Sequence, residues 1–251
     1  MYYNLDNPIA ERKTKTVYKD NDKTIKLFIP NYPKSNILNE AVNQARVEET
    51  GLNIPSLVEV TKIEDRWALV SEHIEGRTLE SLMEEHPEKL DEYLNLFVDT
   101  QINILSKEAP LLNKLKDKMQ RKIAEADISQ DIKYELNIKL ESMLKHKKIC
   151  HGDFNPSNVI IKENGEVYVI DWAHVTQGNA SADVARTYLL FCLNGKKEEA
   201  EKYLNIYSEK TGTEKRYIQK WIPIVAAAHL PKASEEEKAF LMNWVDVIEY
   251  Q

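Results

Sequence analysis

The chain of 251 residues is poor in glycine, since it contains seven glycines and none of them precedes Gly51. A glycine-rich loop of the kind that cradles nucleotide phosphates is therefore absent from the first part of the chain. The two cysteines, Cys150 and Cys192, are too few for a disulfide framework. No apolar run approaches the roughly 18 residues of a membrane span, and the first residues lack the apolar core of a signal peptide. We therefore expect a cytoplasmic protein without a membrane partner.

Positive charge is also scarce, because 34 lysines and arginines stand against 41 aspartates and glutamates, a formal net charge of −7. A basic protein surface favours binding to nucleic acid, because the phosphate backbone is negatively charged. The composition therefore disfavours a nucleic-acid partner. Hydrophobic residues make up 42% of the chain, which is enough for the core of one large domain or of two lobes.

One segment carries most of the chemical information. It reads HGDFNPSNVII from His151 onward, and a polar turn separates it from VYVIDW, which ends in Asp171-Trp172. Asn158 follows Asp153 by five positions, and Asp171 follows it by eighteen. In a phosphoryl-transfer site one carboxylate orients the attacking hydroxyl, while an asparagine and a second carboxylate hold Mg²⁺ against the nucleotide phosphates. Mg²⁺ takes one or two carboxylates plus phosphate oxygens, and this set of residues can supply that arrangement.

The same spacing predicts local structure. Residues 159–161 and 167–170 are short apolar runs, and the polar turn between them contains Asn164-Gly165. Asn-Gly between two such runs is a strong hairpin signal, because both residues tolerate positive φ angles. Antiparallel pairing would bring Asn158, at the start of one strand, beside Asp171, at the end of the other. The alternative is an ordinary surface hairpin with solvated polar ends.

These motifs resemble those of the aminoglycoside phosphotransferase and choline kinase superfamily, whose catalytic loop reads HGDxxxxN and whose metal motif reads IDW or IDF. The resemblance extends more weakly over nearly the whole chain. It implies a two-lobed, protein-kinase-like α+β fold, with Asp153 as the catalytic base and Asn158 and Asp171 as magnesium ligands. It also implies that His151 shapes the catalytic loop and that Asp183 buttresses it. An acid at a helix N-terminus, favoured by the helix dipole, is a compatible second interpretation of Asp183.

The first part of the chain is predicted to be rich in strands. Residues 14–19 and 24–29 flank Asp20-Asn21-Asp22, which suggests another hairpin. Lys26 then lies in a strand, where kinases place the lysine that holds the α- and β-phosphates. Taken alone, a lysine on a strand is more often part of a solvated face.

A helix is predicted over residues 35–49. Five apolar residues form its expected buried stripe: Ile37, Leu38, Ala41, Val42 and Ala45. Glu40 lies on this helix, fourteen positions after Lys26, and is predicted to form the lysine–glutamate ion pair that kinases use. Glu48 and Glu49 are the competing candidates. We prefer Glu40, because its spacing to the following glycine and proline resembles the family's pattern.

Two further predicted strands, residues 57–60 and 67–70, run into residues 71–76, a segment that resembles the hinge between the two lobes of the family. The resemblance implies that the adenine ring of the nucleotide bonds the backbone carbonyl of Glu72 and the backbone amide of Ile74. Backbone contacts leave little mark in a sequence, so this assignment depends on the resemblance.

Helical periodicity dominates from Leu79 onward. The pattern predicts a helix over residues 93–105 and two helices within the charged segment 114–147. It also predicts four helical stretches that begin near Val184, Lys197, Glu214 and Ser234. We expect a nucleotide-binding domain over residues 1–74. Residues 75–251 are expected to form a helical domain that contains the catalytic loop and binds the acceptor.

The short interval between Asp171 and Asp183 restricts the class of molecule that could accept the phosphoryl group. Only twelve positions separate the two residues, and no APE-like sequence follows. Protein kinases need a longer activation segment there. We therefore expect a kinase that moves the terminal phosphoryl group of ATP or GTP to a hydroxyl of a small molecule, such as an aminoglycoside or an amino-alcohol.

The sequence leaves the identity of that acceptor open. A polycationic aminoglycoside would need several carboxylates, and those available are at residues 235–237, Asp246 and Glu249. A quaternary ammonium would need an aromatic cage, for which the candidates are Trp172, Trp221 and Trp244. A solvated terminal helix and tryptophans in a helical core explain the same residues with fewer assumptions.

Two other function classes remain open. The turn at residues 11–16, which is expected to cover the nucleotide, is basic and hydroxyl-bearing instead of glycine-rich. It leaves open a pseudokinase that binds nucleotide without chemistry. A metal-dependent hydrolase would combine imidazole and carboxylate ligands: His151, Asp153, Asp171 and His174. That interpretation leaves Lys26, Glu40 and Asn158 without roles.

Overall fold

The structure is a computed structural model that describes residues 3–245. The carboxylates of Asp246 and Glu249, considered above for an aminoglycoside, lie outside the described residues. Contacts between residues divide the described chain into two compact units. The first unit comprises residues 3–85 and 156–174, and the second comprises residues 86–155 and 175–245. The predicted domain boundary between Ile74 and Glu75 stays a prediction.

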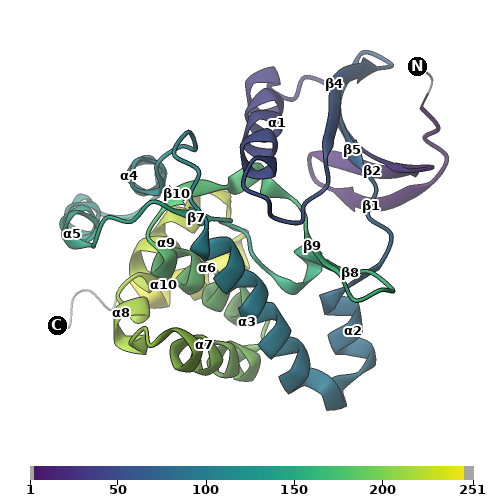
Figure 1. The fold of residues 1–251 in the computed structure, drawn as a ribbon. Helices are drawn as coiled ribbons and strands as arrows, with labels where there is room; N and C mark the ends of the chain where they lie inside the picture. Colours follow the sequence, from purple (N-terminus) through teal and green to yellow (C-terminus); the bar gives the residue numbers. More distant parts are fainter. Residues whose placement is uncertain (1–2, 246–251) are drawn as a thin grey trace. The chain divides into compact units, whose positions relative to one another are not determined.

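Within the described residues, the first unit contains a five-stranded antiparallel sheet in the order β1-β2-β3-β5-β4 (Figure 1). Its strands are β1 (Pro8–Arg12), β2 (Lys15–Asp20), β3 (Lys23–Phe28), β4 (Leu57–Ile63) and β5 (Arg66–Glu72). Helix α1 (Lys34–Glu48) packs against β4 and β5. The remaining elements of this unit are β6 (Arg77–Thr78), α2 (Leu79–Glu85), η2 (Pro156–Asn158), β8 (Val159–Ile161), β9 (Val167–Val169) and η3 (Trp172–His174).

The second unit is mostly helical. Its helices are η1 (Pro87–Lys89), α3 (Leu90–Ser106), α4 (Leu115–Glu125), α5 (Gln130–Ser142), α6 (Ala180–Leu193), α7 (Lys197–Thr211), α8 (Lys215–Gln219), α9 (Ile222–His229), η4 (Leu230–Lys232) and α10 (Glu235–Val245). Two short strands, β7 (Lys148–Cys150) and β10 (Thr176–Gly178), pair antiparallel beside them. The predicted α+β class, a small antiparallel sheet lobe plus a larger helical lobe, is therefore confirmed.

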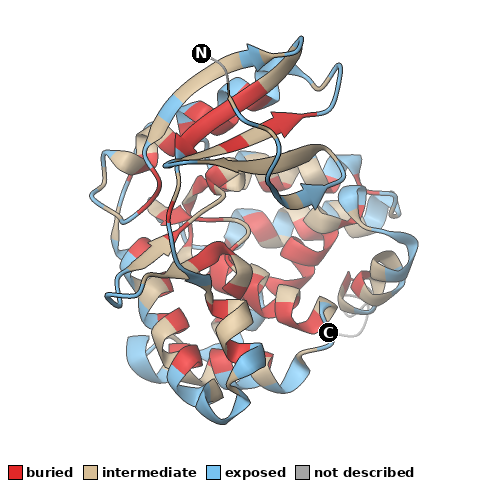
Figure 2. Ribbon diagram, turned by 90° about the vertical axis from the view of Figure 1, so that its right-hand side faces the viewer, coloured by how far each residue is buried: buried red, intermediate tan, exposed pale blue. Residues whose placement is uncertain are grey.

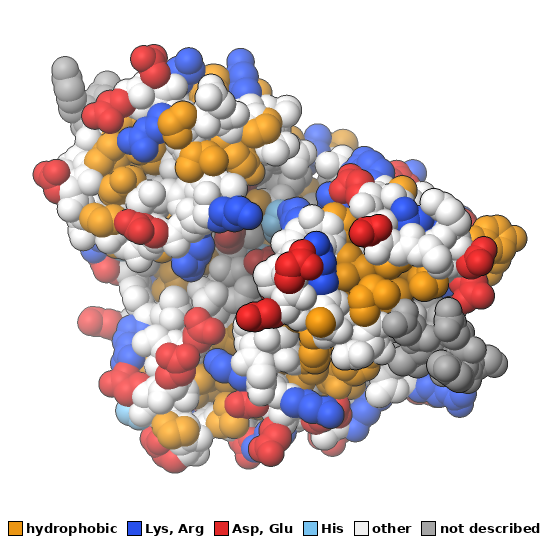
Figure 3. Space-filling model, turned by 180° about the vertical axis from the view of Figure 1, so that it is seen from behind, with side chains coloured by type: hydrophobic (Ala, Val, Ile, Leu, Met, Phe, Trp, Pro, Cys, Tyr) orange, Lys and Arg blue, Asp and Glu red, His pale blue; other side chains and the backbone are white. Residues whose placement is uncertain are grey.

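The predicted helical segments differ from the observed ones in one place. Residues 114–147 form two helices, as expected, but the stretch that begins near Glu214 divides into α8 and α9. Pro223 lies in the first turn of α9, where its missing amide hydrogen costs nothing. None of the helices between residues 3 and 245 has the length and apolar character needed to cross a bilayer. On the face shown in Figure 3, acidic and basic side chains are interspersed.

The five-stranded sheet has an apolar core on both of its faces, and its buried strands stand out in Figure 2. Ile25 and Leu27 of β3 pack on one face with Ala68 and Val70 of β5. On the other face Phe28 and Leu69 pack against Ile37 and Ala41 of α1. Side chains alternate between the faces of a strand. Lys26 therefore projects from the same face as Phe28, the face that α1 covers.

The buried side of α1 differs from the predicted apolar stripe. Ile37 and Ala41 are buried as expected, but Leu38 and Val42 are 41% and 44% exposed. Polar residues occupy the buried positions in their place: Glu40, Asn43 and Gln44. Each of them has a polar partner within the first unit, although Oδ1 of Asn43 has none among the described residues. Burying a polar group without a partner is costly, so these partners explain why α1 buries a polar side.

The predicted hairpin is present and is formed by β8 and β9. The amide of Gly165 donates to the carbonyl of Lys162, and Lys162 also pairs with Glu166. Gly165 adopts a φ of 83°, whereas Asn164 is not among the residues with positive φ. A three-residue loop with glycine in the left-handed position closes the hairpin. The Asn-Gly signal was therefore right about the hairpin, and of its two residues only Gly165 adopts a positive φ.

We predict that Gly76→Ala destabilises the first unit through a direct clash. A Cβ atom at this position would lie 2.5 Å from the backbone oxygen of Ile161 and 2.7 Å from Cγ2 of Ile160. Overpacking of this kind should lower the free energy of unfolding by about 3 kcal/mol, measured by denaturant unfolding. The matched control is Gly165→Ala, which meets no atom within 4 Å and should cost only about 1 kcal/mol for its left-handed φ. Equal losses in the two variants would contradict the clash.

Candidate active site

A cluster of opposite charges lies between the sheet and α1 in the first unit. The Nζ atom of Lys26 on β3 lies 2.6 Å from Oε1 of Glu40 on α1 and 2.9 Å from Oδ1 of Asp171. The side chains of Lys26 and Glu40 are 13% and 8% exposed. The structure thus brings together three of the residues predicted from the sequence. It also selects Glu40 over Glu48, whose carboxylate accepts the amide of Leu57 instead.

This charge cluster fixes the protonation of the buried lysine. Burial alone would lower the pKa of Lys26, because a low-dielectric environment disfavours the charged ammonium. The attraction of Asp171 and Glu40, together with the hydrogen bonds that both accept, outweighs burial and raises the pKa of Lys26 above its ordinary value. Lys26 is therefore a permanent cation at neutral pH.

A second lysine, which the sequence analysis did not assign, joins the same cluster. The Nζ atom of Lys15 on β2 lies 3.4 Å from Oδ1 of Asp171 and 3.7 Å from Oε1 of Glu40. Val17 pairs with Lys26 across the hairpin, and Lys15 lies two positions before Val17. Residues two apart share a face of a strand, so Lys15 and Lys26 project from the same face. The predicted hairpin already placed Lys15 and Lys26 on paired strands. Placing both side chains on the same face required the exact register of the pairing, which the sequence did not provide.

Asp171 is held in an unusual backbone conformation. It follows β9 with a φ of 63°, in the left-handed region where aspartate is one of the few tolerated side chains. Asn158 stands opposite Ile170, whose amide donates to the Asn158 carbonyl over 2.9 Å. Asn158 and Asp171 are therefore neighbours at the base of one hairpin, as predicted. Asn43 of α1 donates a hydrogen bond to the carbonyl of Ala173 in η3 and ties the helix to this segment.

Residues 151–155 of the predicted catalytic loop lie in the second unit and follow β7. Phe154 is fully buried and stacks on Phe97 of α3 with ring centroids 4.3 Å apart. His151 is also fully buried, and its Nδ1 atom accepts the amide of Asp153 over 3.2 Å. The loop is therefore anchored on both sides of Asp153. The Nη2 atom of Arg186 lies 3.6 Å from Oδ1 of that carboxylate.

Asp183 supports the same loop from the first turn of α6. Its Oδ1 atom accepts the amide of Gly152 over 2.7 Å, and its Oδ2 atom accepts Nε2 of Gln101 over 3.2 Å. Burial raises the pKa of Asp183, while His151 and these hydrogen bonds oppose that rise. Thr187, one helical turn after Asp183, donates to the carbonyl of Phe154. Gln101 and Thr187 were not predicted as part of the site. The four-residue spacing of Thr187 from Asp183 places both residues on the same face of a helix and could have indicated a role for Thr187.

The two hinge residues have ordinary structural surroundings. Glu72 ends β5, and its carboxylate accepts the amide of Ser56 over 3.2 Å. Ile74 is buried. The amide of His73 donates to the carbonyl of Asp22, which fixes the backbone between the two hinge residues. The proposed contacts of Glu72 and Ile74 with an adenine ring stay a prediction.

The described residues contain no group of three or more His, Cys, Asp or Glu side chains arranged to hold a metal ion. This finding gives no support to the hydrolase set, in which four such side chains would bind one metal. A kinase-type Mg²⁺ site needs fewer protein ligands, because phosphate oxygens complete the coordination. The carboxylate of Asp171 and the amide oxygen of Asn158 are hard oxygen donors of the kind that this ion prefers, so these residues fit it.

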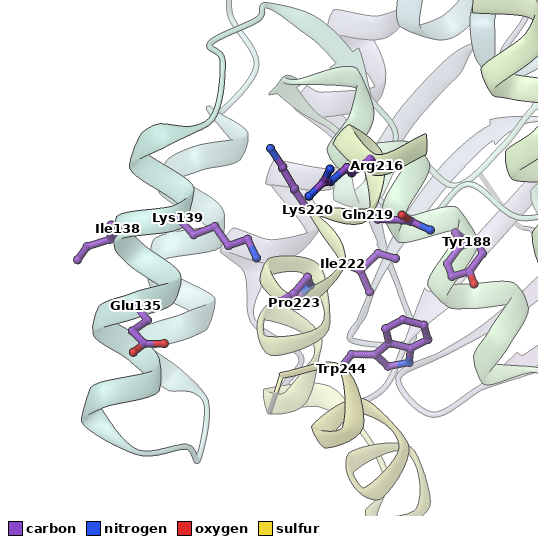
Figure 4. Close-up of a pocket in the computed structure, with 10 residues that line it drawn as sticks. All are labelled: Glu135, Ile138, Lys139, Tyr188, Arg216, Gln219, Lys220, Ile222, Pro223 and Trp244. Atoms are coloured by element: carbon purple, nitrogen blue, oxygen red, sulfur yellow. The ribbon is translucent and has the colours of Figure 1, made fainter. Parts of the chain in front are cut away.

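The tryptophans considered as an aromatic cage are dispersed. Trp172 is buried in the first unit, where its indole donates to the carbonyl of Val169. Trp221 and Trp244 line two different pockets of the second unit. The pocket around Trp244 has a volume of about 580 Å³, and Figure 4 shows Tyr188 beside Trp244 on its wall. The residues that line this pocket include none of the predicted site residues. The three tryptophans therefore do not form one cage.

Comparisons with known proteins connect these features to a family. The sequence model of the phosphotransferase enzyme family, APH, matches residues 14–218. A thermostable mutant of aminoglycoside phosphotransferase APH(4)-Ia has a TM-score of 0.70 and 15% sequence identity, with 96% of this chain and 92% of that chain covered. The aminoglycoside-3'-phosphotransferase of type VIII gives 0.62 and 17%, covering 98% and 92%. Choline kinase LicA from Streptococcus pneumoniae gives 0.57 and 16%, covering 98% and 86%.

A comparison with curated proteins finds no match. At identities of 15–17%, the likeness to the solved structures shows the fold. The family match is broader evidence, because it covers most of the chain and includes Lys15, Lys26 and the segments around Asp153 and Asp171. The chain therefore belongs to the phosphotransferase enzyme family.

Proposed function

We propose that the chain is a phosphotransferase that moves the terminal phosphoryl group of ATP or GTP to a hydroxyl group of a small molecule. The observation that carries this proposal is the contact of Lys26 with both Glu40 and Asp171. Kinases use such a lysine to hold phosphates, such a glutamate to orient the lysine and such an aspartate to bind the metal. Mutants of one protein of similar fold, aminoglycoside phosphotransferase APH(4)-Ia, form ternary complexes with AMP-PNP and hygromycin B and with ADP and hygromycin B.

The first unit is proposed to bind the nucleotide. Lys26 contacts the α- and β-phosphates, and Glu40 holds its ammonium in place. Lys15 adds a second cation on the same face of the sheet, so two lysines take over charge stabilisation that a glycine-rich loop provides through backbone amides in other kinases. The adenine ring bonds the carbonyl of Glu72 and the amide of Ile74.

Mg²⁺ is the implied cofactor, and Asn158 and Asp171 are its proposed ligands. When bound, the ion would neutralise charge on the phosphate oxygens during transfer. The left-handed backbone of Asp171 and its position beside Asn158 support this assignment. Lys26 and Lys15 keep the Asp171 carboxylate oriented through their own charges.

The second unit is proposed to supply the base. Asp153 accepts a hydrogen bond from the acceptor hydroxyl and takes its proton as the phosphoryl group is transferred. Asp183 and His151 position the loop, because Asp183 accepts the amide of Gly152 and His151 accepts the amide of Asp153 itself. Among proteins of similar fold, one aminoglycoside phosphotransferase binds hygromycin B, and another protein is a choline kinase. The cytoplasmic location stays a prediction of the sequence.

A pseudokinase that binds nucleotide without chemistry is the second candidate. The specific observation that favours it is the basic turn before β2, where glycines are missing. The two candidates agree on nucleotide binding and differ in turnover. An assay of phosphoryl transfer from ATP and GTP to a panel of amino-alcohols and aminoglycosides therefore separates them.

We predict that nucleotide with Mg²⁺ raises the melting temperature, since a ligand that binds only the folded state stabilises it by mass action. Asp171→Ala should abolish the magnesium-dependent part of the shift, measured by thermal denaturation with and without Mg²⁺. Asp91→Ala is the control, because this exposed carboxylate pairs with Lys202 in the second unit. If Asp171→Ala responds to Mg²⁺ like the wild type, Asp171 is not a metal ligand.

We predict that Lys26→Met and Lys15→Met each weaken nucleotide binding by about tenfold or more, because each removes a charged hydrogen-bond donor to phosphate. Isothermal titration with AMP-PNP and Mg²⁺ measures the effect. Lys23→Met is matched in charge and lies on the same strand as Lys26, but its ammonium lies over the ring of Tyr3. Affinity of this control should remain near that of wild type. An unchanged affinity in Lys15→Met would remove Lys15 from the nucleotide site.

We predict that Asp153→Asn leaves nucleotide affinity nearly unchanged while turnover falls by roughly 10²-fold or more, the usual scale for an acid–base group. The amide keeps the size of the carboxylate but cannot accept the proton. Steady-state rates with an identified acceptor, together with titration of AMP-PNP, separate the two effects. A wild-type rate in Asp153→Asn would show that the loop motif has been misread.

A further inference from the structure

The surroundings of Asp153 in the second unit carry an excess of positive charge. Arg186 reaches from α6 to within 3.6 Å of the Asp153 carboxylate, with a side chain only 13% exposed. Its Nη1 atom is fully buried and has no hydrogen-bond partner within the described part of the chain. A guanidinium carries five N–H donors, and a buried donor without an acceptor is costly. The arrangement favours an additional anionic acceptor at this position.

Two lysines extend this positive charge. Lys118 lies on α4, and Lys232 ends η4, which follows α9; both α4 and α6 pack against α9. Burial, followed by the charges of Lys232 and Arg186, lowers the pKa of Lys118 to about 8, against the opposing charges of Asp183 and Asp153. Each of the three cations is thus close enough to influence the others. We call Lys118, Arg186 and Lys232 the basic cluster.

Two acidic groups near the basic cluster hold structural hydrogen bonds of their own. The oxygens of Asp183 accept the amide of Gly152 and the side-chain amide of Gln101. Glu237 accepts the amide of Ser234 over 2.7 Å and so caps the first turn of α10. Asp153 forms the ion pair with Arg186.

His229 adds no carboxylate and little charge to this region. Burial, followed by Arg186, lowers the pKa of His229 to about 4, so its imidazole is neutral at pH 7. Lys122 on α4 influences Lys232 but pairs with Glu125. The residues around the proposed base therefore repel a cation, whereas a cationic acceptor such as an aminoglycoside or choline requires carboxylates or an aromatic cage.

We propose that the acceptor carries an oxyanion, a carboxylate or a phosphate, in addition to the hydroxyl that is phosphorylated, and that the basic cluster binds this group. The inference rests on the proposed phosphoryl transfer with Asp153 as the base. The planar fork of Arg186 suits two oxygens of one carboxylate or phosphate. Lys118 and Lys232 supply point charges from two further helices. The same pairing would draw the hydroxyl of the acceptor toward Asp153.

The terminal phosphate of the nucleotide is the competing occupant of the basic cluster. The experiment therefore uses protein saturated with AMP-PNP and Mg²⁺, which supplies all three nucleotide phosphates in a form that is not transferred. Binding of D-glycerate, glycerol 3-phosphate, choline and kanamycin to this complex is measured by isothermal titration. Glycerol serves as the uncharged control. Saturation itself is checked by the thermal shift with AMP-PNP and Mg²⁺.

We expect D-glycerate or glycerol 3-phosphate to bind at least tenfold more tightly than glycerol, choline or kanamycin. Binding of one anion and not the other identifies the carboxylate or the phosphate as the recognised group. Lys118→Met and Lys232→Met should each weaken that binding about tenfold, while AMP-PNP affinity stays within about twofold of wild type. Lys202→Met makes the same change in net charge outside the cluster, where Lys202 pairs with Asp91, and should bind like the wild type.

Tighter binding of choline or kanamycin would overturn the inference, and so would binding of neither anion. Weaker AMP-PNP binding in the lysine variants with unchanged anion binding would assign the cluster to the nucleotide phosphate instead. Lys232 is exposed, so its variant keeps the test valid if the partly buried Lys118→Met variant does not fold. A protein that shows no response to AMP-PNP and Mg²⁺ would overturn the proposed function itself, which is a different result from a nucleotide-bound protein that ignores anions.

Discussion

The buried ammonium of Lys26 constrains the first unit more than any other single group. A lysine at this depth is tolerated only when carboxylates compensate for lost hydration, and removing one partner of such a contact leaves an uncompensated charge. Glu40 and Asp171 meet this requirement from separate segments of the chain. The sheet, α1 and the segment after β9 must therefore fold together before Lys26 is stabilised. Compensation of the buried charge of Lys26 thus brings together the three residues that are proposed to bind phosphate and metal.

The pairing of buried charges explains which features of the first unit were predicted correctly from the sequence and which were not. Strand alternation, the turn residues around Asn21 and the helix signals before Gly51 are local, so the hairpin of β2 with β3 and the extent of α1 were predictable. The buried stripe of α1 was not. Leu38 and Val42 are exposed, because the side of the helix that faces the sheet is used for polar contacts such as that of Glu40. The spacing of apolar residues predicts which residues pack in an apolar core. It cannot predict that a charged residue is buried because it is paired with an opposite charge.

The site shows a related division. Asp153, Asn158 and Asp171 were identified because a motif fixes their spacing, and their roles remain proposals. Lys15 was missed, because its place beside Lys26 depends on strand register, which a single sequence leaves open. Arg186 was also missed, since it reaches Asp153 from another helix. Contacts between distant segments leave no local signal, and the residues that adjust a site's charge are often of this kind.

The two aspartates of the motif are held in opposite ways, which suits different tasks. Asp171 accepts hydrogen bonds from two lysines and sits on a left-handed backbone, so its carboxylate is held in place, as the proposed role of metal ligand requires. Asp153 stands on a loop whose neighbours are anchored, while its own carboxylate has Arg186 at the longer distance of 3.6 Å. As the proposed base, Asp153 must exchange this partner for the acceptor hydroxyl. If the acceptor's own anion takes over Arg186, the carboxylate of Asp153 is released at the moment when it is needed as a base.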